Sequence, residues 1–359
     1  MTSAAPDQPA RPSAYAAAGV DIGAAAGALE RVRRKIQATF PGTGAAAPIG
    51  HFGGLYRLPG GDGRLLVASA DGIGTKIKLA FALGGDAHAR VGGDLVNHCV
   101  NDILACGATP RFFLDYVAMG RFDAEAFEGL VGGMADACRA SGVAMIGGES
   151  AEMPGLYADG EYDAAGFIVG DVAEAAVVDG RAVQTGDAVV GLPSGGLQTN
   201  GYSLARKLIG LTGDHDADRA TLAEPLPGGE GGTLGEALMA PHRSFAPALR
   251  PLIDAGTVHG MAHITGGGLL DNVPRMLPDG LSAEIAPGSW DVPAVFGHLV
   301  ELGELSAADR YRTFNMGLGF VVVVDPADAP RVLAAAGGSS VLGRVVPTPA
   351  GGERVIGLV

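Results

Sequence analysis

The chain has 359 residues, of which 47% are hydrophobic and 18% are charged, and its formal net charge is -14. This composition excludes a disordered protein, and the acidic balance excludes a broad nucleic-acid-binding surface, which needs a basic stripe. The sequence contains no uninterrupted apolar run of about 18 residues and no early apolar segment, so we expect neither a membrane span nor a secretory signal.

The N-terminal half is predicted to form one α/β domain behind a polar tail. Residues 1–14, rich in alanine and proline, are expected to be a disordered tail, and 15–171 to be the first domain. Asp123 is expected to cap one of its helices. Hydrophobic spacing predicts helices near 24–36, 88–108 and 123–142 and a Gly/Pro-rich loop over 40–59. It also predicts strands over 64–71, 111–120 and 162–172, and a strand followed by a turn within 143–150.

The C-terminal half repeats an order of strand, glycine-rich turn and helix. This order occurs in 187–210, 258–277 and 317–336, after a boundary placed between 171 and 185. It predicts a second α/β domain over 172–359, so the fold class is α/β (α+β) with two domains.

The segment ADGIGTK has the composition of a phosphate loop but matches neither the P-loop pattern nor the dinucleotide fingerprint. Gly72 and Gly74 allow backbone amides to approach an anion, Thr75 offers a hydroxyl and Lys76 a positive charge. Asp71 would repel a bare phosphate but would bind Mg²⁺. The segment therefore favours a metal–nucleotide complex, and the alternative is a turn with a surface salt bridge.

Further carboxylates follow in the first domain. Asp94, Asn101 and Asp102 are spaced i, i+7 and i+8, so one helix face can present all three. Glu149 follows a glycine pair at the expected end of a strand, where α/β proteins often place their sites. A single aspartate of this kind is most often a helix cap, but together with Asp71 these acids could hold Mg²⁺ on a triphosphate.

Two glycine-rich turns in the second domain, 194–203 and 264–272, open predicted helices. The N-terminus of a helix binds phosphate through its free amides and its dipole. Ordinary tight turns are the alternative for each of them.

The histidines and cysteines give less evidence of a metal or catalytic site. His98, Cys99 and Cys106 match no common zinc pattern, so the three thiols of the chain are expected in the core and in a reducing cytosol. His51 and His263 lie in glycine-rich segments and are the better candidates for a general acid or base, although His263 could equally be structural.

Seven segments, in this order, closely resemble the phosphoribosylformylglycinamidine cyclo-ligase family, also called aminoimidazole ribonucleotide synthetase. The resemblance extends from about Tyr15 to the C-terminus, and the motifs are highly specific as a set. They are AGVDI (18–22), ADGIGTK (70–76), CVNDILACGATPRFFLDY (99–116), IGGESAEMPG (146–155), YDAAGFIVG (162–170), TNGYSLAR (199–206) and HITGGGLLDNVPR (263–275).

The resemblance implies an ATP-dependent enzyme of purine biosynthesis. It would close the imidazole ring of formylglycinamidine ribonucleotide through phosphorylation of the formyl oxygen, and release 5-aminoimidazole ribonucleotide, ADP and phosphate. It also implies a cytoplasmic homodimer in which the N-terminal sheets pair into a barrel, with the C-terminal α/β domains outside. Its cofactors would be ATP and Mg²⁺, with no nucleic-acid or membrane partner.

The same resemblance assigns candidate site residues. His263 and Lys76 would be catalytic, and Asp71, Asp94, Asp102 and Glu149 would bind metal. The nucleotide contacts would be Asp71, Gly72, Gly74, Thr75, Lys76, Asn101, Gly147 and Gly148. The substrate contacts, including the ribose 5′-phosphate, would be Ser194, Gly195, Gly196, Thr199, Asn200, Gly201, Thr265, Gly266, Gly267 and Gly268.

Two positions depart from the family pattern. Gln198 stands where the family commonly has histidine, and Arg33 stands where a lysine linked with the nucleotide is common. The alternatives are therefore an impaired homologue or a sister ATP-dependent enzyme of the same superfamily. The selenophosphate and hydrogenase-maturation relatives need a cysteine near one terminus, and this sequence places none there.

Overall fold

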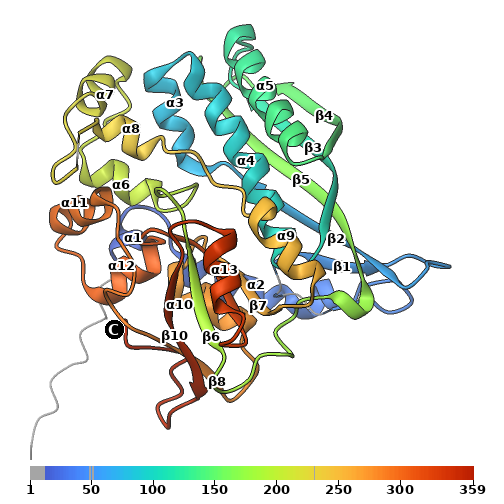
Figure 1. Cartoon of the computed structure of the whole chain (residues 1–359). Coiled ribbons are helices and arrows are strands. Elements are labelled where there is room, and N and C mark those ends of the chain that lie inside the picture. Colours follow the sequence, from blue (N-terminus) through green and yellow to red (C-terminus); the bar gives the residue numbers. More distant parts are fainter. Residues whose placement is uncertain (1–12, 48–49, 51, 230) are drawn as a thin grey trace, which may run out of the picture.

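The computed structural model describes residues 13–47, 50, 52–229 and 231–359, and it contains two β-sheets with helices packed around them (Figure 1). The tail expected over 1–14 lies almost entirely outside these residues. Within them, no helix combines the length and the apolar character that crossing a membrane requires. The mixed α/β architecture predicted from the sequence is confirmed.

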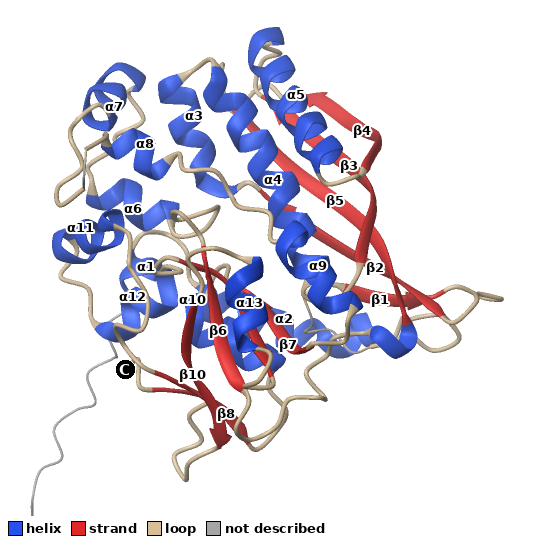
Figure 2. Ribbon diagram, in the orientation of Figure 1, coloured by secondary structure: helices blue, strands red, loops and turns tan. Residues whose placement is uncertain are grey.

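The first sheet has the strand order β1-β2-β5-β3-β4, and only β3 and β4 pair in parallel. Helices lie over one face of it (Figure 2). Its strands are β1 (Gly54–Arg57), β2 (Arg64–Gly72), β3 (Thr109–Met119), β4 (Ala144–Glu152) and β5 (Tyr162–Ala173). The helices of this half are α1 (Ala14–Ala17), α2 (Ile22–Gln37), α3 (Ile77–Leu83), α4 (Asp86–Leu104) and α5 (Ala124–Ala140).

Several predicted boundaries need correction. The predicted loop over 40–59 contains β1, which pairs with β2. Strand β4 does not end before Glu149 but continues to Glu152, because it pairs with β3 along its whole length. The predicted cap of α5 is confirmed, since the Asp123 side chain accepts a hydrogen bond from the amide of Ala126.

Helices α4 and α5 pack in close contact through glycines. A Cβ atom added at Gly133 of α5 would lie 1.9 Å from the carbonyl oxygen of Ala89 on α4. A Cβ atom added at Gly92 of α4 would lie 2.0 Å from the carbonyl oxygen of Leu130. The short interaxial distance therefore depends on the absence of side chains at these two positions.

Gly133→Ala is expected to destabilise the protein by about 1–3 kcal/mol, because the new methyl group meets rigid backbone. The matched control is Gly132→Ala on the same helix, where an added Cβ has nothing within 4 Å. There the better helix propensity of alanine should stabilise the protein by up to about 1 kcal/mol. Thermal unfolding of both variants tests the pair, and equal shifts would contradict the close helix contact.

The second sheet has the strand order β11-β8-β10-β6-β9-β7 and is antiparallel except for the pairing of β11 with β8. Its strands are β6 (Ala188–Pro193), β7 (Val258–His263), β8 (Leu281–Ile285), β9 (Leu318–Val324), β10 (Ser340–Pro347) and β11 (Val355–Ile356). The helices are α6 (Tyr202–Leu208), α7 (His215–Leu222), α8 (Leu234–Leu238), α9 (Ala246–Asp254), α10 (Gly268–Asn272), α11 (Ala294–Leu302), α12 (Ala307–Thr313) and α13 (Ala329–Ala335).

Strand β9 is buried along its entire length, which explains its continuous apolar sequence. Phe320, Val322 and Val324 share a cluster with side chains of α9 and α13. Val321 and Val323 belong to the larger cluster that continues into the first half of the chain. The sheet is therefore covered on both faces.

The segment 239–245, which leads into α9, joins the two halves by packing along α4. Arg90 donates to the carbonyl of Met239 at 3.3 Å, and Asn97 to that of His242 at 2.9 Å. The Asn101 amide donates to the carbonyl of Arg243 at 2.8 Å and accepts from the amide of Phe245 at 2.9 Å. These bonds fix α4 against the second domain at the place where polar residues gather.

Candidate active site at the domain interface

Strand β2 and helix α4 present four polar side chains to the interface. Ser69 and Asp71 pair with Ile168 and Gly166 of β5, on the sheet face that α4 covers. His98 and Asp102 are one turn apart on α4 and point back toward β2. The hydroxyl of Ser69 donates to Asp102 Oδ2 at 3.0 Å, and His98 Nε2 lies 2.7 Å from Asp71 Oδ2.

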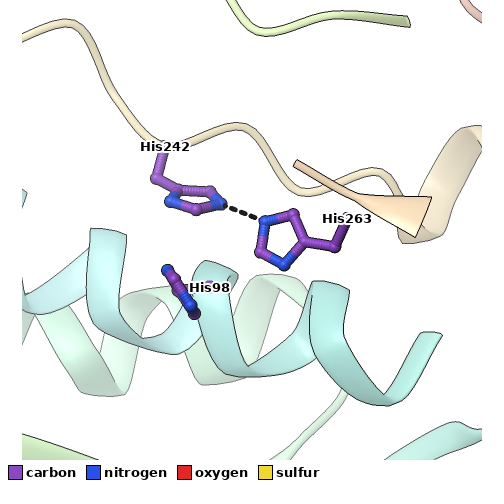
Figure 3. Close-up of side chains that lie close together, drawn as sticks. All are labelled: His98, His242 and His263. Atoms are coloured by element: carbon purple, nitrogen blue, oxygen red, sulfur yellow. Dashed lines mark hydrogen bonds between the residues drawn. The ribbon is translucent and has the colours of Figure 1, made fainter. Parts of the chain in front are cut away.

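The second domain contributes three further groups. They are Thr199 from the turn after β6, His242 from the segment 239–245, and His263 from the end of β7. Figure 3 shows the two histidines of the second domain, His242 and His263, directed toward each other above His98 of α4. All three imidazoles are buried, with at most 1% of their surface exposed.

Hydrogen bonds connect these groups in one chain across the interface. Thr199 Oγ1 lies 2.5 Å from His98 Nδ1 and 3.4 Å from His242 Nδ1. The Nε2 atoms of His242 and His263 are 3.2 Å apart, and His263 Nδ1 lies 2.8 Å from Asp102 Oδ1. Because Asp102 also accepts from the β2 hydroxyl, the chain of bonds returns to the strand that carries Asp71.

The three histidines do not titrate alike. Burial opposes the charged form of His98, but the Asp71 and Asp102 carboxylates raise its pKa to about 9. Burial and the neighbouring charges lower the pKa of His242 well below its usual value. Burial also lowers the pKa of His263, against the opposing effect of Asp102. At neutral pH the cluster therefore holds its positive charge on His98.

Asp71 remains an anion at the edge of this cluster. Burial works to raise its pKa, but the charge and the hydrogen bond of His98 outweigh it and hold the pKa of the carboxyl below its usual value. The side chain is 41% exposed. It is therefore the member of the cluster that a ligand in solvent can reach.

Lys76 and Asp94 do not face this opening. The Lys76 ammonium has no exposed surface, lies 2.5 Å from Asp94 Oδ2 and donates to the carbonyl of Ala240 at 2.9 Å. The other Asp94 oxygen accepts from the amide of His242 at 2.6 Å. In this arrangement the two residues join the domains, and neither offers a free charge to phosphate or metal. The catalytic role of Lys76 and the metal-binding role of Asp94 stay predictions.

The glycine segment after Asp71 lies against the second domain. Gly72 ends β2, and Gly74 starts a 3₁₀ turn that ends at Lys76. Gly74 has φ of 67°, a backbone conformation that favours glycine. The Thr75 hydroxyl lies 3.1 Å from that of Ser203, at the start of α6. The segment therefore opens toward the first glycine-rich turn of the second domain.

The two glycine-rich turns lie next to each other. They follow β6 and β7, the two neighbours of β9, and an added Cβ at Gly266 would lie 3.7 Å from the Asn200 amide nitrogen. In the first turn the Ser194 hydroxyl donates to the carbonyl of Gly196. In the second, Gly268 has φ of 58° and approaches the carbonyl of Tyr311 closely. The structure thus brings together the turns predicted to bind substrate.

Glu149 is not brought together with the other carboxylates. It pairs with Tyr116 of β3, in the row of β5 residue Ala165, on the sheet face away from α4. Asp71 occupies the neighbouring row, whose side chains point to the opposite face. Gly147 and Gly148 lie in the same edge strand, and Gly148 pairs with Asp115 of β3 in the row that contains Asp71.

Two functional candidates were missed or only partly described by sequence reasoning. His242 follows a proline in a segment without a motif, so only its packing on α4 shows its importance. Gln198 has φ of 64° and is buried, and within the described part of the chain both polar atoms of its side chain lack a hydrogen-bond partner. His51, a candidate acid or base, lies outside the described residues.

Comparison with known families covers both halves of the chain. Residues 50–172 match the AIR synthase related protein N-terminal domain, and 184–356 match the C-terminal domain of the same family. Phosphoribosylformylglycinamidine cyclo-ligase of Sorangium cellulosum is 47% identical over 345 residues, covering 92% of this chain and 95% of the relative. The chloroplastic/mitochondrial cyclo-ligase of Vigna unguiculata is 47% identical over 319 residues, covering 89% of this chain and 76% of the relative.

Solved structures support the fold at much lower identity. "AaThiL complexed with AMPPCP and TMP" is 14% identical, with a TM-score of 0.59, and covers 92% of each chain. "T. maritima PurL complexed with FGAR" is 20% identical, with a TM-score of 0.57, and covers 89% of this chain and 47% of that one. With both domain matches and relatives near half identity along the chain, this protein belongs to the phosphoribosylformylglycinamidine cyclo-ligase family.

Proposed function

We propose that this protein uses ATP to close the imidazole ring of formylglycinamidine ribonucleotide. The products are 5-aminoimidazole ribonucleotide, ADP and phosphate, and the reaction is a step of purine biosynthesis. The observation that carries the proposal is the 47% identity to a cyclo-ligase over 92% of the chain. The domain interface adds a set of acids, amides and imidazoles suited to positioning a phosphorylated substrate.

The donor set at the interface fits Mg²⁺. Asp71 and Asp102 offer carboxylate oxygens on either side of His98, with candidate ligand atoms within 4.8 Å of one another. Mg²⁺ prefers oxygen ligands together with water and phosphate. We assign the ion to these two residues, and when bound it would neutralise charge on the transferred phosphoryl group. For Asp94 and Glu149 metal binding stays a prediction, because Asp94 is paired with Lys76 and Glu149 lies on the other face of the sheet.

The remaining roles follow from what each residue can reach. The amide of Gly74 and the hydroxyl of Thr75 follow Asp71 in the chain and can bind nucleotide phosphates. The Gly72 amide donates to Asp71 Oδ1 at 2.7 Å, so the nucleotide contact of Gly72 stays a prediction. The two glycine-rich turns supply amides for the ribose 5′-phosphate. Asn101 positions the segment 239–245, because its side chain donates to the carbonyl of Arg243 and accepts from the amide of Phe245. We assign it this positioning role rather than direct contact with the nucleotide. His263 is the imidazole that can accept or release a proton next to Asp102.

The first experiment measures ADP release by the purified protein with ATP and Mg²⁺, with and without formylglycinamidine ribonucleotide, alongside a colour test for the aromatic amine. Substrate-dependent ADP with an equal amount of amine is expected. The proposal would be overturned if ADP release were the same with and without formylglycinamidine ribonucleotide, or if the folded protein showed no turnover. Gln198→His is the companion variant, because it restores the residue common in the family and shows whether glutamine limits the rate.

We also propose a homodimer formed through the open face of the first sheet. Helices cover only one face, while β4 is exposed along most of its length. Ile146 and Phe167 on this sheet are 61% and 42% exposed. Apolar side chains gathered on one face mark interaction surfaces in soluble proteins. The buried unpaired thiols Cys99, Cys106 and Cys138 fit a cytoplasmic location.

Phe167→Asp is expected to convert the dimer into a monomer at micromolar concentration, because a charge would be buried in the centre of the interface. Light scattering coupled to size exclusion measures the mass. Leu302→Asp serves as the control, since it adds the same charge to an exposed apolar site in the other domain and should leave the dimer intact. A monomeric wild-type protein would remove the proposal.

A further inference from the structure

Two asparagines hold the two glycine-rich turns of the second domain from the inside. Asn315 precedes β9 and is 5% exposed, and Asn272 ends α10 and is 2% exposed. Each side chain directs its amide group at main-chain carbonyls of one turn. The same pattern of hydrogen bonds therefore occurs twice, once in each turn.

In the first turn, Asn315 Nδ2 donates to the carbonyl of Gly196 at 3.0 Å and to that of Leu197 at 3.2 Å. Its Oδ1 atom accepts from the amide of Gly317 at 2.8 Å, which fixes the end of the side chain that carries the donor. The Ser194 hydroxyl donates to the same Gly196 carbonyl at 2.7 Å. Two consecutive carbonyls of the turn therefore face Asn315.

In the second turn, Asn272 has the same function. Its Oδ1 atom accepts from Arg275 Nη1 at 3.3 Å, so its nitrogen is the atom that faces the main chain. An NH₂ group has two hydrogens, and one of them is shared between two acceptors here. The nitrogen donates to three carbonyls, those of Thr265 at 3.3 Å, Gly266 at 3.1 Å and Gly268 at 3.0 Å.

The hydrogen bonds of Asn315 decide where the amides of the first turn point. In a trans peptide the C=O and N–H bonds point in opposite directions, and the described residues contain no cis peptide. The carbonyls of Gly196 and Leu197 share their peptide groups with the amides of Leu197 and Gln198. These two amides therefore point away from Asn315, and among the described residues no acceptor lies within hydrogen-bond distance of them.

The free amides of Leu197 and Gln198 mark a ligand position, because buried main-chain amides nearly always have a partner. Both residues are at most 2% exposed. Gln198 has φ of 64°, and left-handed residues in turns place successive amides on one side, an arrangement that binds anions. The Gln198 side chain also has no partner at either polar atom, within the part of the chain that the structure describes.

The second turn repeats this geometry next to the first. The amides of Gly266 and Gly267 belong to peptide groups whose carbonyls bind Asn272, so they point away from it. Across residues 13–47, 50, 52–229 and 231–359, no acceptor is close to either amide. A Cβ atom added at Gly266 would lie 3.7 Å from Asn200 Nδ2, so the four free amides belong to neighbouring turns.

We propose that Asn315 and Asn272 are positioning residues for the phosphate group of the substrate. Each holds the carbonyls of its turn inward, so that the turn presents amide donors and not carbonyl oxygens to the anion. A flipped peptide would place a carbonyl oxygen against the phosphate, and the asparagine hydrogen bonds oppose this flip. The inference rests on the proposed function, which assigns the two turns to the ribose 5′-phosphate, and it adds the residues that keep these turns able to bind it.

The first test uses the full-length wild-type protein with ribose 5-phosphate as the probe and ribose as the matched control ligand. Hydrogen–deuterium exchange follows the peptides that cover 194–201 and 264–269. We expect rapid exchange at the four amides in the free protein, and protection by ribose 5-phosphate but not by ribose. Titration calorimetry measures both affinities, and neither measurement requires turnover.

Asn315→Ala and Asn272→Ala are each expected to weaken ribose 5-phosphate binding by about 10-fold or more, because the hydrogen bonds to the charged phosphate depend on the held turn. The affinity for ATP with Mg²⁺ should stay at the wild-type value, which a general loss of stability would not allow. Ser282→Ala is the matched control and should bind ribose 5-phosphate as the wild type does. It removes a buried hydrogen bond to the carbonyl of Glu353, at 2.6 Å, from a side chain on β8 outside both turns.

The inference is overturned if ribose 5-phosphate leaves the exchange of both turns unchanged in the wild type, since the free amides then do not face the anion. It is also overturned if both alanine variants bind ribose 5-phosphate as tightly as the wild type, or lose affinity for ATP to the same extent. If the alanine variants do not fold, Asn315→Ser and Asn272→Ser are read in the same way. A protein that passes these tests but does not close the imidazole ring removes the proposed reaction and leaves this inference in place.

Discussion

Replacement of Asp71 by asparagine is expected to lower kcat for ADP release by about 100-fold or more while the protein stays folded. A loss of about 3 kcal/mol in transition-state stabilisation corresponds to this factor. Asparagine keeps the size of the side chain and an oxygen that can accept from His98, but it removes the negative charge that a Mg²⁺ ion needs. The partial exposure of Asp71 makes it the carboxylate best placed to meet a metal–nucleotide complex.

The experiment measures kcat at increasing Mg²⁺ concentration, together with the unfolding temperature. If Asp71 is a metal ligand, the rate of the variant should recover partly at high Mg²⁺, because a weakened Mg²⁺ site can still be saturated by more of the ion. Asp279→Asn removes the same charge from a fully exposed position in the second domain and should leave the rate unchanged. Wild-type activity in Asp71→Asn would contradict the assignment of Asp71 as a Mg²⁺ ligand.

Lys76→Met is expected to destabilise the protein by about 3–5 kcal/mol, because it leaves the Asp94 carboxylate buried without its cation. Lys76 has no exposed surface, and its ammonium lies 2.5 Å from Asp94 Oδ2. Lys78→Met is the matched control. Its ion pair with Glu161 is about one-third exposed, so its loss should cost less than about 1 kcal/mol.

The double variant Lys76→Met/Asp94→Asn separates the two roles of Lys76. Asparagine is neutral and still accepts from the amide of His242, so the double variant should be more stable than Lys76→Met alone. Urea unfolding measures the difference. If Lys76 also contacts phosphate, the double variant regains stability but not ATP turnover. Equal stability of the single and double variants would show that the buried pair is not the cause of the loss.

The buried pair and the histidine cluster share one structural consequence. Both connect α4 to the segment 239–245, through Asp94 in one case and through His98 and His242 in the other. Because α4 also carries Asp102, the geometry of the proposed Mg²⁺ site depends on how the segment 239–245 packs against α4. Changes along 239–245 are therefore expected to affect the site without touching a ligand.

The sequence by itself determined the family, the two-domain α/β class and the strands and helices next to the glycine-rich segments. These features rest on local patterns: hydrophobic spacing, glycine at tight turns, and polar residues at fixed intervals such as Asp94, Asn101 and Asp102. All three were predicted to share a helix face, and all three are buried in contacts along α4. The site roles assigned from the resemblance remain predictions for the experiments above.

Only the tertiary structure decided which polar groups meet. Lys76 was read as a free charge because a sequence shows no partner, yet the fold buries it against Asp94. Glu149 was grouped with Asp71, but the register of β4 with β3 turns it to the other face, since side chains alternate along a strand. His242 has no motif and reaches His263 only because the segment 239–245 packs on α4. Burial, register and long-range pairing arise when distant segments pack together, so local patterns cannot specify them.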